Sequence, residues 1–193
     1  MRRRSFARLT AVAALIALPT AARAQLRAHA IDHAHSEINF TASSRLLDAH
    51  GTFDRWDAEV AVDSANPERS TVRITIDASS IDTRVAMRDN HLKSPAFFDA
   101  AKYPTIVFES KSFQRNGDRA GTITGDLTMH GVTKPVTVPV TAVFYGGGRG
   151  RFRGTFTLNR SEWGVTGQSA MNPIEDAVEV QFNFSLADKK PAP

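Results

Sequence analysis

The chain of 193 residues has no cysteine, which excludes disulfide bonds and thiol chemistry, so packing alone must hold the fold. It also has only two tryptophans and two tyrosines. Transmembrane β-barrels carry girdles of aromatic residues at both membrane interfaces, so this scarcity argues against an outer-membrane barrel. Recovery of the protein only in detergent would revive that alternative. The motifs G-x-S-x-G and H-E-x-x-H are absent too, and we therefore expect no enzymatic activity.

Residues 1–24 resemble a cleavable export signal. Arginines at positions 2, 3, 4 and 8 precede an apolar run at 9–18, and Ala22-Arg23-Ala24 matches a cleavage site. The apolar run is shorter than the roughly 20 residues that span a bilayer. We expect cleavage before Gln25, with export by the Sec route or, because Arg3-Arg4 resembles a twin-arginine signal, by the twin-arginine route.

Removal of this signal changes the charge of the protein. The signal holds five of the 24 basic residues and no acidic one, which leaves 19 basic against 20 acidic side chains. The basic character of the whole chain therefore comes from the signal. We expect no nucleic-acid partner and no membrane-spanning segment in what remains.

Most of the remaining chain alternates apolar and polar residues, which is the pattern of β-strands with one buried face. Residues 178–186 give the clearest case, with valine, phenylalanine and leucine at every second position. About eight such segments are joined by turn signals, among them Asn116-Gly117-Asp118 and Gly146-Gly147-Gly148. We predict a single all-β domain over residues 25–193, built as an eight-stranded antiparallel barrel or a sandwich.

One stretch, about residues 83–103, does not alternate and predicts a short helical insertion. Asp82 or Thr83 can cap a first helix that runs to about Lys93. Ser94 can cap a second one, because the proline that follows it suits the first helical position. A strand then begins after Pro104.

Three segments resemble the signatures of the YceI-like family: residues 88–99 (RDNHLKSPAFFD), 102–110 (KYPTIVFES) and 125–136 (GDLTMHGVTKPV). Residues 174–178 (IEDAV) depart from the glycine-acidic pair that is frequent in the family before the last strand, which affects one turn. Shorter matches extend the resemblance over almost all of the chain after the signal; they are His35-Ser36, Gly51-Thr52-Phe53, Asn159-Arg160 and Trp163-Gly164.

The resemblance implies a lipocalin-like antiparallel β-barrel that is exported to the periplasm. It also implies an elongated internal pocket that holds a polyisoprenoid or another long-chain amphiphile, and no cofactor besides such an isoprenoid or fatty-acyl lipid. The family includes dimers, so a homodimer is an open expectation, although no coiled-coil pattern in this chain requires one.

An eight-stranded barrel with strands of about ten residues is about 25 Å tall, which suits a long apolar tail. Each methylene of such a tail that is buried contributes about 0.8 kcal/mol to binding. We place Arg88, Asp89 and His91 of the insertion at the pocket rim. The expected lining consists of inward-facing apolar side chains, which are Phe40, Phe53, Val62, Ile74, Phe97, Phe98, Ile106, Phe108, Leu127, Met129, Val138, Phe156, Leu158, Phe182 and Phe184.

Two other functional classes stay open on the sequence. The same apolar side chains could fill a dry core, which would suit a structural or stress-response interaction protein. Stabilisation of the protein by added lipid would exclude that alternative. His33 and His35, with His29 and Glu37 nearby, could instead form the metal site of a His-dependent enzyme. We expect surface roles for these histidines and no metal.

Overall fold

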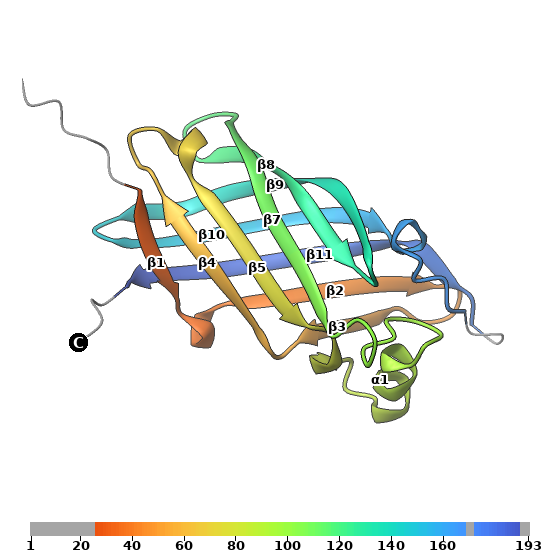
Figure 1. Cartoon of the computed structure of the whole chain (residues 1–193). Coiled ribbons are helices and arrows are strands. Elements are labelled where there is room, and N and C mark those ends of the chain that lie inside the picture. Colours follow the sequence, from red (N-terminus) through yellow and green to blue (C-terminus); the bar gives the residue numbers. More distant parts are fainter. Residues whose placement is uncertain (1–25, 169–171, 190–193) are drawn as a thin grey trace, which may run out of the picture.

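The computed structural model describes residues 26–168 and 172–189, whose strands form one closed antiparallel barrel with a single α-helix, α1 (Ala86–Lys93) (Figure 1). The predicted export signal at 1–24 and its cleavage site lie outside the described residues. The strands are β1 (Arg27–Ile31), β2 (Glu37–Ser44), β3 (Ala49–Phe53), β4 (Trp56–Val62), β5 (Thr71–Asp77), β6 (Ile81–Asp82), β7 (Thr105–Arg115), β8 (Ala120–Met129), β9 (Val132–Gly146), β10 (Arg149–Asn159) and β11 (Ile174–Asp188).

Three pairs of consecutive segments act as single bent strands of the barrel. The first pair is β1 with β2, and both segments pair with β11. The second is β3 with β4, where β3 pairs with β2 and β4 pairs with β1. The third is β5 with β6, where β5 pairs with β4 and β6 pairs with β3. With each pair counted once, eight antiparallel strands follow one another around the barrel in chain order. Pairing of His29 in β1 with Asp188 in β11 closes the ring. The predicted eight-stranded antiparallel barrel is confirmed.

The predicted hairpin turns are also confirmed. Residues 116–119 join β7 to β8, and Gly147-Gly148 join β9 to β10. His130 and Gly131 join β8 to β9 with φ angles of 51° and 76°. Positive φ at both positions is the geometry of a two-residue type I′ turn, which matches the twist of the flanking strands.

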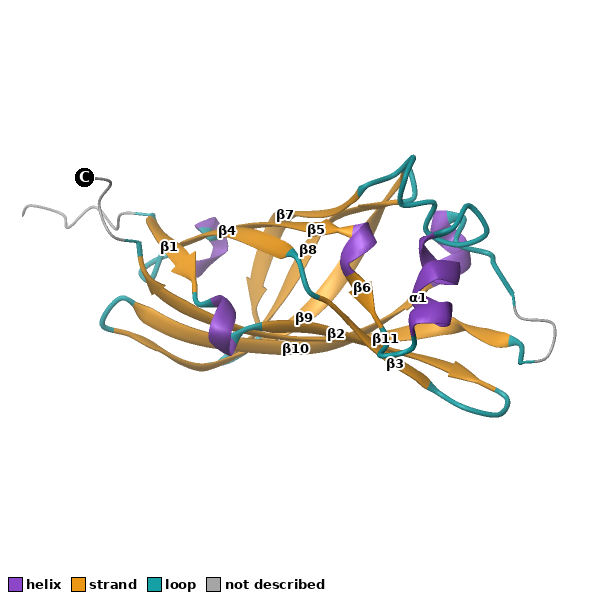
Figure 2. Cartoon of the chain, turned by 90° about the horizontal axis from the view of Figure 1, so that it is seen from below, coloured by secondary structure: helices purple, strands orange, loops and turns teal. Residues whose placement is uncertain are grey.

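The barrel has two different ends (Figure 1, Figure 2). The helix end carries α1, the β2–β3 loop at residues 45–48 and the connection between β10 and β11. The hairpin end carries the β4–β5, β7–β8 and β9–β10 connections.

The insertion contains one helix, so the prediction of two helices was wrong. The cap of α1 is Val85, and neither Asp82 nor Thr83 takes that position. Residues 94–103 form successive turns, and the N–H of Asp99 reaches back to the carbonyl of Ser94. Asp99 has a φ of 45°, outside the right-handed helical region, so no helix continues through it.

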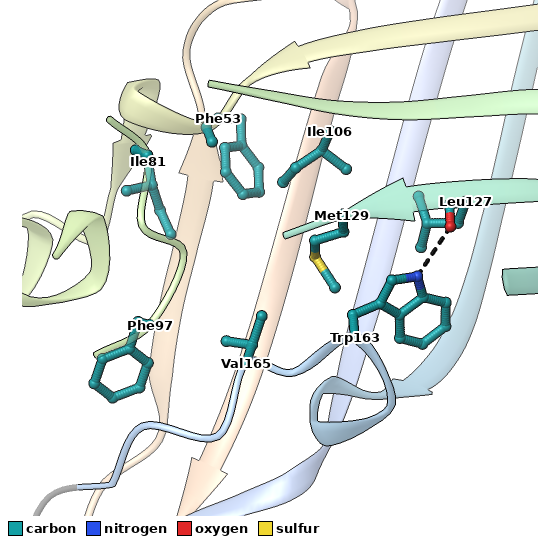
Figure 3. Packing of buried hydrophobic residues seen from close by; sticks show 10 residues of the cluster. Phe53, Ile81, Phe97, Ile106, Leu127, Met129, Trp163 and Val165 are labelled. Carbon is teal, nitrogen blue, oxygen red and sulfur yellow. Dashed lines mark hydrogen bonds between the residues drawn. The ribbon is translucent and has the colours of Figure 1, made fainter. Parts of the chain in front are cut away.

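A packed apolar core lies at the helix end (Figure 3). Trp163, which is only 2% exposed, donates its Nε1–H to the carbonyl of Leu127 at 2.9 Å. The insertion contributes Phe97 and Ala100 to this core, so it is fixed to the barrel by buried contacts. The core consists of Phe53, Ala78, Ile81, Phe97, Ala100, Ile106, Leu127, Met129, Trp163 and Val165.

Candidate functional site

A cavity of about 1060 Å³ runs through the inside of the barrel. This volume is slightly larger than the range of about 300–1,000 Å³ that is typical of ligand pockets. Its wall includes Leu47 and Met87 at the helix end and Gly117 and Arg119 at the hairpin end, all exposed side chains or turn residues. The cavity therefore extends along the whole barrel and reaches the surface at both ends.

All fifteen side chains predicted to line a pocket lie on the wall of this cavity. Whether they contact a ligand stays a prediction. They differ in accessibility, which separates packed parts of the wall from hollow ones. The buried ones are Phe53, Phe97, Ile106, Leu127, Met129, Val138 and Phe184. The half-buried ones are Phe40, Val62, Ile74, Phe98, Phe108, Phe156, Leu158 and Phe182.

Half-buried residues inside a barrel indicate a hollow interior, because interior side chains of a filled core lose almost all accessible surface. The glycines of the wall help to explain this hollow. A Cβ atom at Gly51 would overlap the ring of Phe40, and one at Gly125 would overlap the ring of Phe108. Each ring thus lies against the wall where a glycine leaves room for it, and the middle of the barrel stays open.

Two of the three rim residues predicted on the insertion, Arg88 and Asp89, form hydrogen bonds with Thr83, which is buried directly after β6. The Asp89 carboxylate accepts the N–H of Thr83 at 2.8 Å and its hydroxyl at 2.5 Å. Arg88 donates to the hydroxyl and the carbonyl of Thr83, both at 2.8 Å. Arg88 and His91 line the cavity, as expected. Asp89 was expected at the pocket rim but does not line the cavity. It is buried, with its carboxylate bonded to Thr83.

The two neighbouring phenylalanines of the insertion have different surroundings. Phe97 is 3% exposed, and its ring meets the ring of His91 edge-on at 4.8 Å. Phe98 is half-buried and meets the ring of Phe53 edge-on at 6.1 Å. Phe97 therefore belongs mainly to the packed core, whereas Phe98 keeps surface that faces the cavity.

Arg160 is a buried cation that sequence reasoning did not select as a site residue. It is 7% exposed, lines the cavity at the helix end, and burial lowers the pKa of its guanidinium. The guanidinium donates to four backbone carbonyls, those of Val165 at 2.7 Å, Gly167 at 2.9 Å, Glu175 at 3.1 Å and Ile174 at 3.2 Å. It thus holds the connection between β10 and β11 against the barrel.

Asp176 supports the same connection from outside. Its carboxylate accepts the hydroxyl of Ser161 at 2.6 Å and the N–H of Ser161 at 2.8 Å, and these bonds lower the pKa of Asp176. The charge of Asp176 also favours the protonated guanidinium of Arg160 and so opposes the effect of burial. Arg160 is therefore a structural cation at the cavity wall.

The hairpin end of the cavity is more polar than its middle. Ser70, Ser110, Arg115 and Arg119 line it there, next to the hydroxyl-bearing ring of Tyr145. Burial raises the pKa of Tyr145, whose hydroxyl group lies 3.1 Å from Nε2 of His29. Together with Arg88, His91 and Arg160 at the helix end, the wall combines a long apolar middle with polar groups at both ends, which suits an amphiphilic molecule.

The histidines of the metal-site alternative do not converge on one point. Nε2 of His33 lies 3.4 Å from the carboxylate of Asp57, and Nδ1 of His35 lies 2.9 Å from that of Asp32. Within residues 26–168 and 172–189, no three metal-ligating side chains are grouped closely enough to hold a metal ion. The expectation that the protein needs no metal stays a prediction.

No helix among the described residues is both long enough and apolar enough to cross a membrane.

A sequence profile of the YceI-like domain matches residues 29–186, which include almost the whole barrel. The chain belongs to the YceI-like family. The UPF0312 protein of Pseudomonas savastanoi pv. phaseolicola is 35% identical over 190 residues, which cover 94% of this chain and 97% of that protein. The resemblance of segments 88–99, 102–110 and 125–136 to this family is thereby confirmed.

Two solved structures compare closely with this YceI-like chain. BcnA of Burkholderia cenocepacia is 27% identical, with a TM-score of 0.75 over 80% of this chain and 98% of BcnA. A polyisoprenoid binding domain from Saccharophagus degradans has a TM-score of 0.67 over 86% of this chain and 100% of that domain. Because that domain is only 16% identical, the likeness shows a shared fold alone.

Some members of the cavity wall were missed although their sequence signal is ordinary. Ile76, Phe152 and Val180 line the cavity, and each continues the alternation of residues that were selected. The period-2 pattern, applied along each full strand, would have found them.

Proposed function

We propose that this YceI-like protein binds a long-chain amphiphile, a polyisoprenoid or a fatty-acyl lipid, non-covalently inside the barrel. In this proposal it is a carrier or sequestering protein of the periplasm and catalyses no reaction. The observation that carries the proposal is the apolar-walled cavity of about 1060 Å³, which extends through the barrel. The polyisoprenoid binding domain of Saccharophagus degradans, which has the same fold, supports this ligand class.

The accessibility of the wall favours this proposal over a dry-core interaction protein. Phe40, Phe108 and Phe182 point into the barrel and stay half-buried, so partner atoms are missing on their inner sides. A long acyl or isoprenoid chain would supply those contacts. At about 0.8 kcal/mol per methylene, a dozen buried methylenes are enough for tight binding after the entropic cost of association.

Purified protein is expected to carry a lipid that native mass spectrometry detects as added mass and that organic extraction releases. After extraction, adding back a long-chain fatty acid should raise the melting temperature. Free ligand at a hundred times its Kd stabilises the folded state by about 2.7 kcal/mol. A barrel that carries no lipid and is not stabilised by fatty acid or isoprenoid would contradict the proposal.

The periplasmic location has its own test. Expressed in a Gram-negative host, the protein should be released with the periplasmic fraction. Its intact mass should correspond to a chain that begins at Gln25. Full-length protein in the cytoplasmic fraction would contradict this part of the proposal without touching the binding function.

Replacement Gly51→Ala is expected to narrow the cavity. The new methyl group would overlap the Phe40 ring and, less closely, the methyl group of Thr83. The ring is the closer of the two and is the far end of a side chain that can move toward the lumen. A fluorescent long-chain fatty acid should then bind about tenfold more weakly, since a displaced ring removes the volume of several methylenes. Fluorescence titration measures the effect.

Gly146→Ala is the matched control, because a Cβ atom there meets nothing within 4 Å. It should leave the affinity unchanged. If the Gly51→Ala variant and the unmodified protein had equal affinities, Phe40 would not lie next to the part of the cavity that the ligand occupies.

A further inference from the structure

The three most exposed large apolar side chains of the described residues lie at the helix end, where Val85 is exposed too, whereas Leu26, Val143 and Phe144 toward the opposite end are at most 50% exposed. Met87 is 84% exposed, Leu47 76%, Leu46 69% and Val85 47%. They come from two separate segments, the β2–β3 loop and the start of α1 (Figure 2). Soluble proteins rarely leave such side chains together in water without a binding role.

Both segments border the cavity at the helix end. β3, which begins directly after the loop, pairs with β6, which directly precedes the start of the insertion. A Cβ atom at Gly51 in β3 would contact the methyl group of Thr83. Leu47, Val85 and Met87 all line the cavity. Leu46 precedes Leu47 in the same exposed loop. The four exposed side chains at this end of the cavity, Leu46, Leu47, Val85 and Met87, are called the apolar rim below.

The exposed leucines are held in place by hydrogen bonds of their loop. The N–H of Leu46 donates to the side-chain oxygen of Asn172 at 3.1 Å, and the hydroxyl group of Ser44 donates to the carbonyl of Leu47. Nδ2 of Asn172 also donates to the Ser44 hydroxyl at 2.6 Å. The loop thus presents its two leucines to solvent in a defined arrangement.

The geometry of the apolar rim fits a lipid surface better than a protein partner. A standard protein interface involves about 20–30 residues on each side, whereas the rim consists of a few separate tips. A fluid bilayer accepts such tips without shape complementarity. Arg45 and Arg84, both exposed, flank the rim and form no ion pair with another described residue. Their guanidinium groups suit the phosphates of phospholipid head groups.

We propose that the helix end docks on the surface of a phospholipid bilayer, with the apolar rim inserted among the lipids and Arg45 and Arg84 at head-group level. The biological purpose of this docking rests on the proposed function, because docking would bring the barrel to a source of its lipid ligand. The rim borders the cavity at this end, so an amphiphile could pass between bilayer and barrel without crossing water. Docking itself depends only on the rim and can be measured without any cargo.

Because the chain has no cysteine, a single introduced cysteine can carry a fluorescent label at a chosen position and so test docking locally. In single variants Leu47→Cys and Met87→Cys of the full chain, an environment-sensitive nitrobenzoxadiazole label should gain fluorescence severalfold on vesicles of phosphatidylethanolamine and phosphatidylglycerol. Val143→Cys, at the hairpin end and 37% exposed, is the matched control and should not change. A gain at the control site alone, or at no site, would overturn the proposal.

A second experiment removes the apolar rim. The double variant Leu46→Asp with Met87→Asp is expected to bind these vesicles at least about tenfold more weakly, since insertion of one large apolar side chain is worth about a factor of ten or more. The double variant Leu26→Asp with Val143→Asp, two exposed apolar residues at the opposite end, should bind like the unmodified protein. Equal losses in both double variants would overturn the proposal.

Titration with a fluorescent fatty acid in vesicle-free buffer separates docking from cargo binding. Fatty-acid uptake without any vesicle contact at positions 47 and 87 would overturn the docking proposal and leave the proposed function intact. Vesicle contact at these positions without fatty-acid uptake would support docking and contradict the proposed function.

Discussion

Replacement of Arg160 by methionine is expected to lower the free energy of unfolding by about 3–5 kcal/mol. The change removes one buried guanidinium and leaves the carbonyls of Val165, Gly167 and Glu175 without this donor. The carbonyl of Ile174 also loses a bond to Arg160 but keeps the side-chain amide of Gln168 as a donor at 3.3 Å. Methionine has a similar length but no polar hydrogen, so it cannot satisfy any of them. Each unsatisfied buried group costs about 1–3 kcal/mol, less where cavity water reaches it. Urea denaturation followed by circular dichroism measures the loss.

Two further variants sharpen the interpretation of this result. Arg160→Lys keeps the charge, but a single ammonium cannot reach four carbonyls in fixed directions, so we expect an intermediate loss. Arg149→Met removes an exposed arginine and should change stability by less than about 0.5 kcal/mol. If Arg160→Met behaved like Arg149→Met, water in the cavity would be the true partner of those carbonyls.

The role of Arg160 was beyond the reach of sequence reasoning for a physical reason. Its partners are backbone carbonyls, which every residue possesses, and they are brought to it only by the path of the connection between β10 and β11. No residue type marks such a site in advance. The sequence offered Arg160 only as part of the match Asn159-Arg160 to the family.

The barrel and its wall could be predicted because strand periodicity encodes the direction of each side chain. Alternation along 178–186 places Phe182 and Phe184 on the inner face, and pairing of Val180 with Phe40 and Phe156 continues that face onto the neighbouring strands. The pattern could not separate a filled interior from a hollow one. That difference depends on close approaches such as the Phe40 ring over Gly51.

The helical insertion was predicted less well, because local signals there compete with tertiary contacts. Ser94 and Pro95 form a good helix start in isolation, yet the chain turns at Asp99 with positive φ. This turn lets Phe97 and Ala100 enter the core at the helix end. Burial of these side chains stabilises the turn more than a short exposed helix could, since isolated short helices are marginal in water.

Replacement Val180→Glu is expected to weaken binding of a fluorescent long-chain fatty acid at least about tenfold at neutral pH. Val180 is half-buried on the cavity wall, between Phe40 and Phe156 of the neighbouring strands. A bound alkyl chain would displace water from the new carboxylate and leave its charge without solvation, which costs at least 1–3 kcal/mol even after adjustment of its pKa. Thr155→Glu is the matched control, because threonine has nearly the same shape as valine and Thr155 lies on the exposed outer face of β10. This variant should leave the affinity unchanged.

The pH dependence of the Val180→Glu variant distinguishes a lost contact from a charge effect. An alkyl chain over the carboxyl group favours its neutral form, so the pKa of this group is higher in the bound state than in the free state. Affinity should therefore be greatest below the free-state pKa and fall as pH rises through the bound-state pKa, where the charge must be buried. The unmodified protein and Thr155→Glu should lack this slope. A pH-independent loss in Val180→Glu would mean that the larger side chain, and not its charge, displaces the ligand. An unchanged affinity would mean that the ligand does not pass this point of the wall.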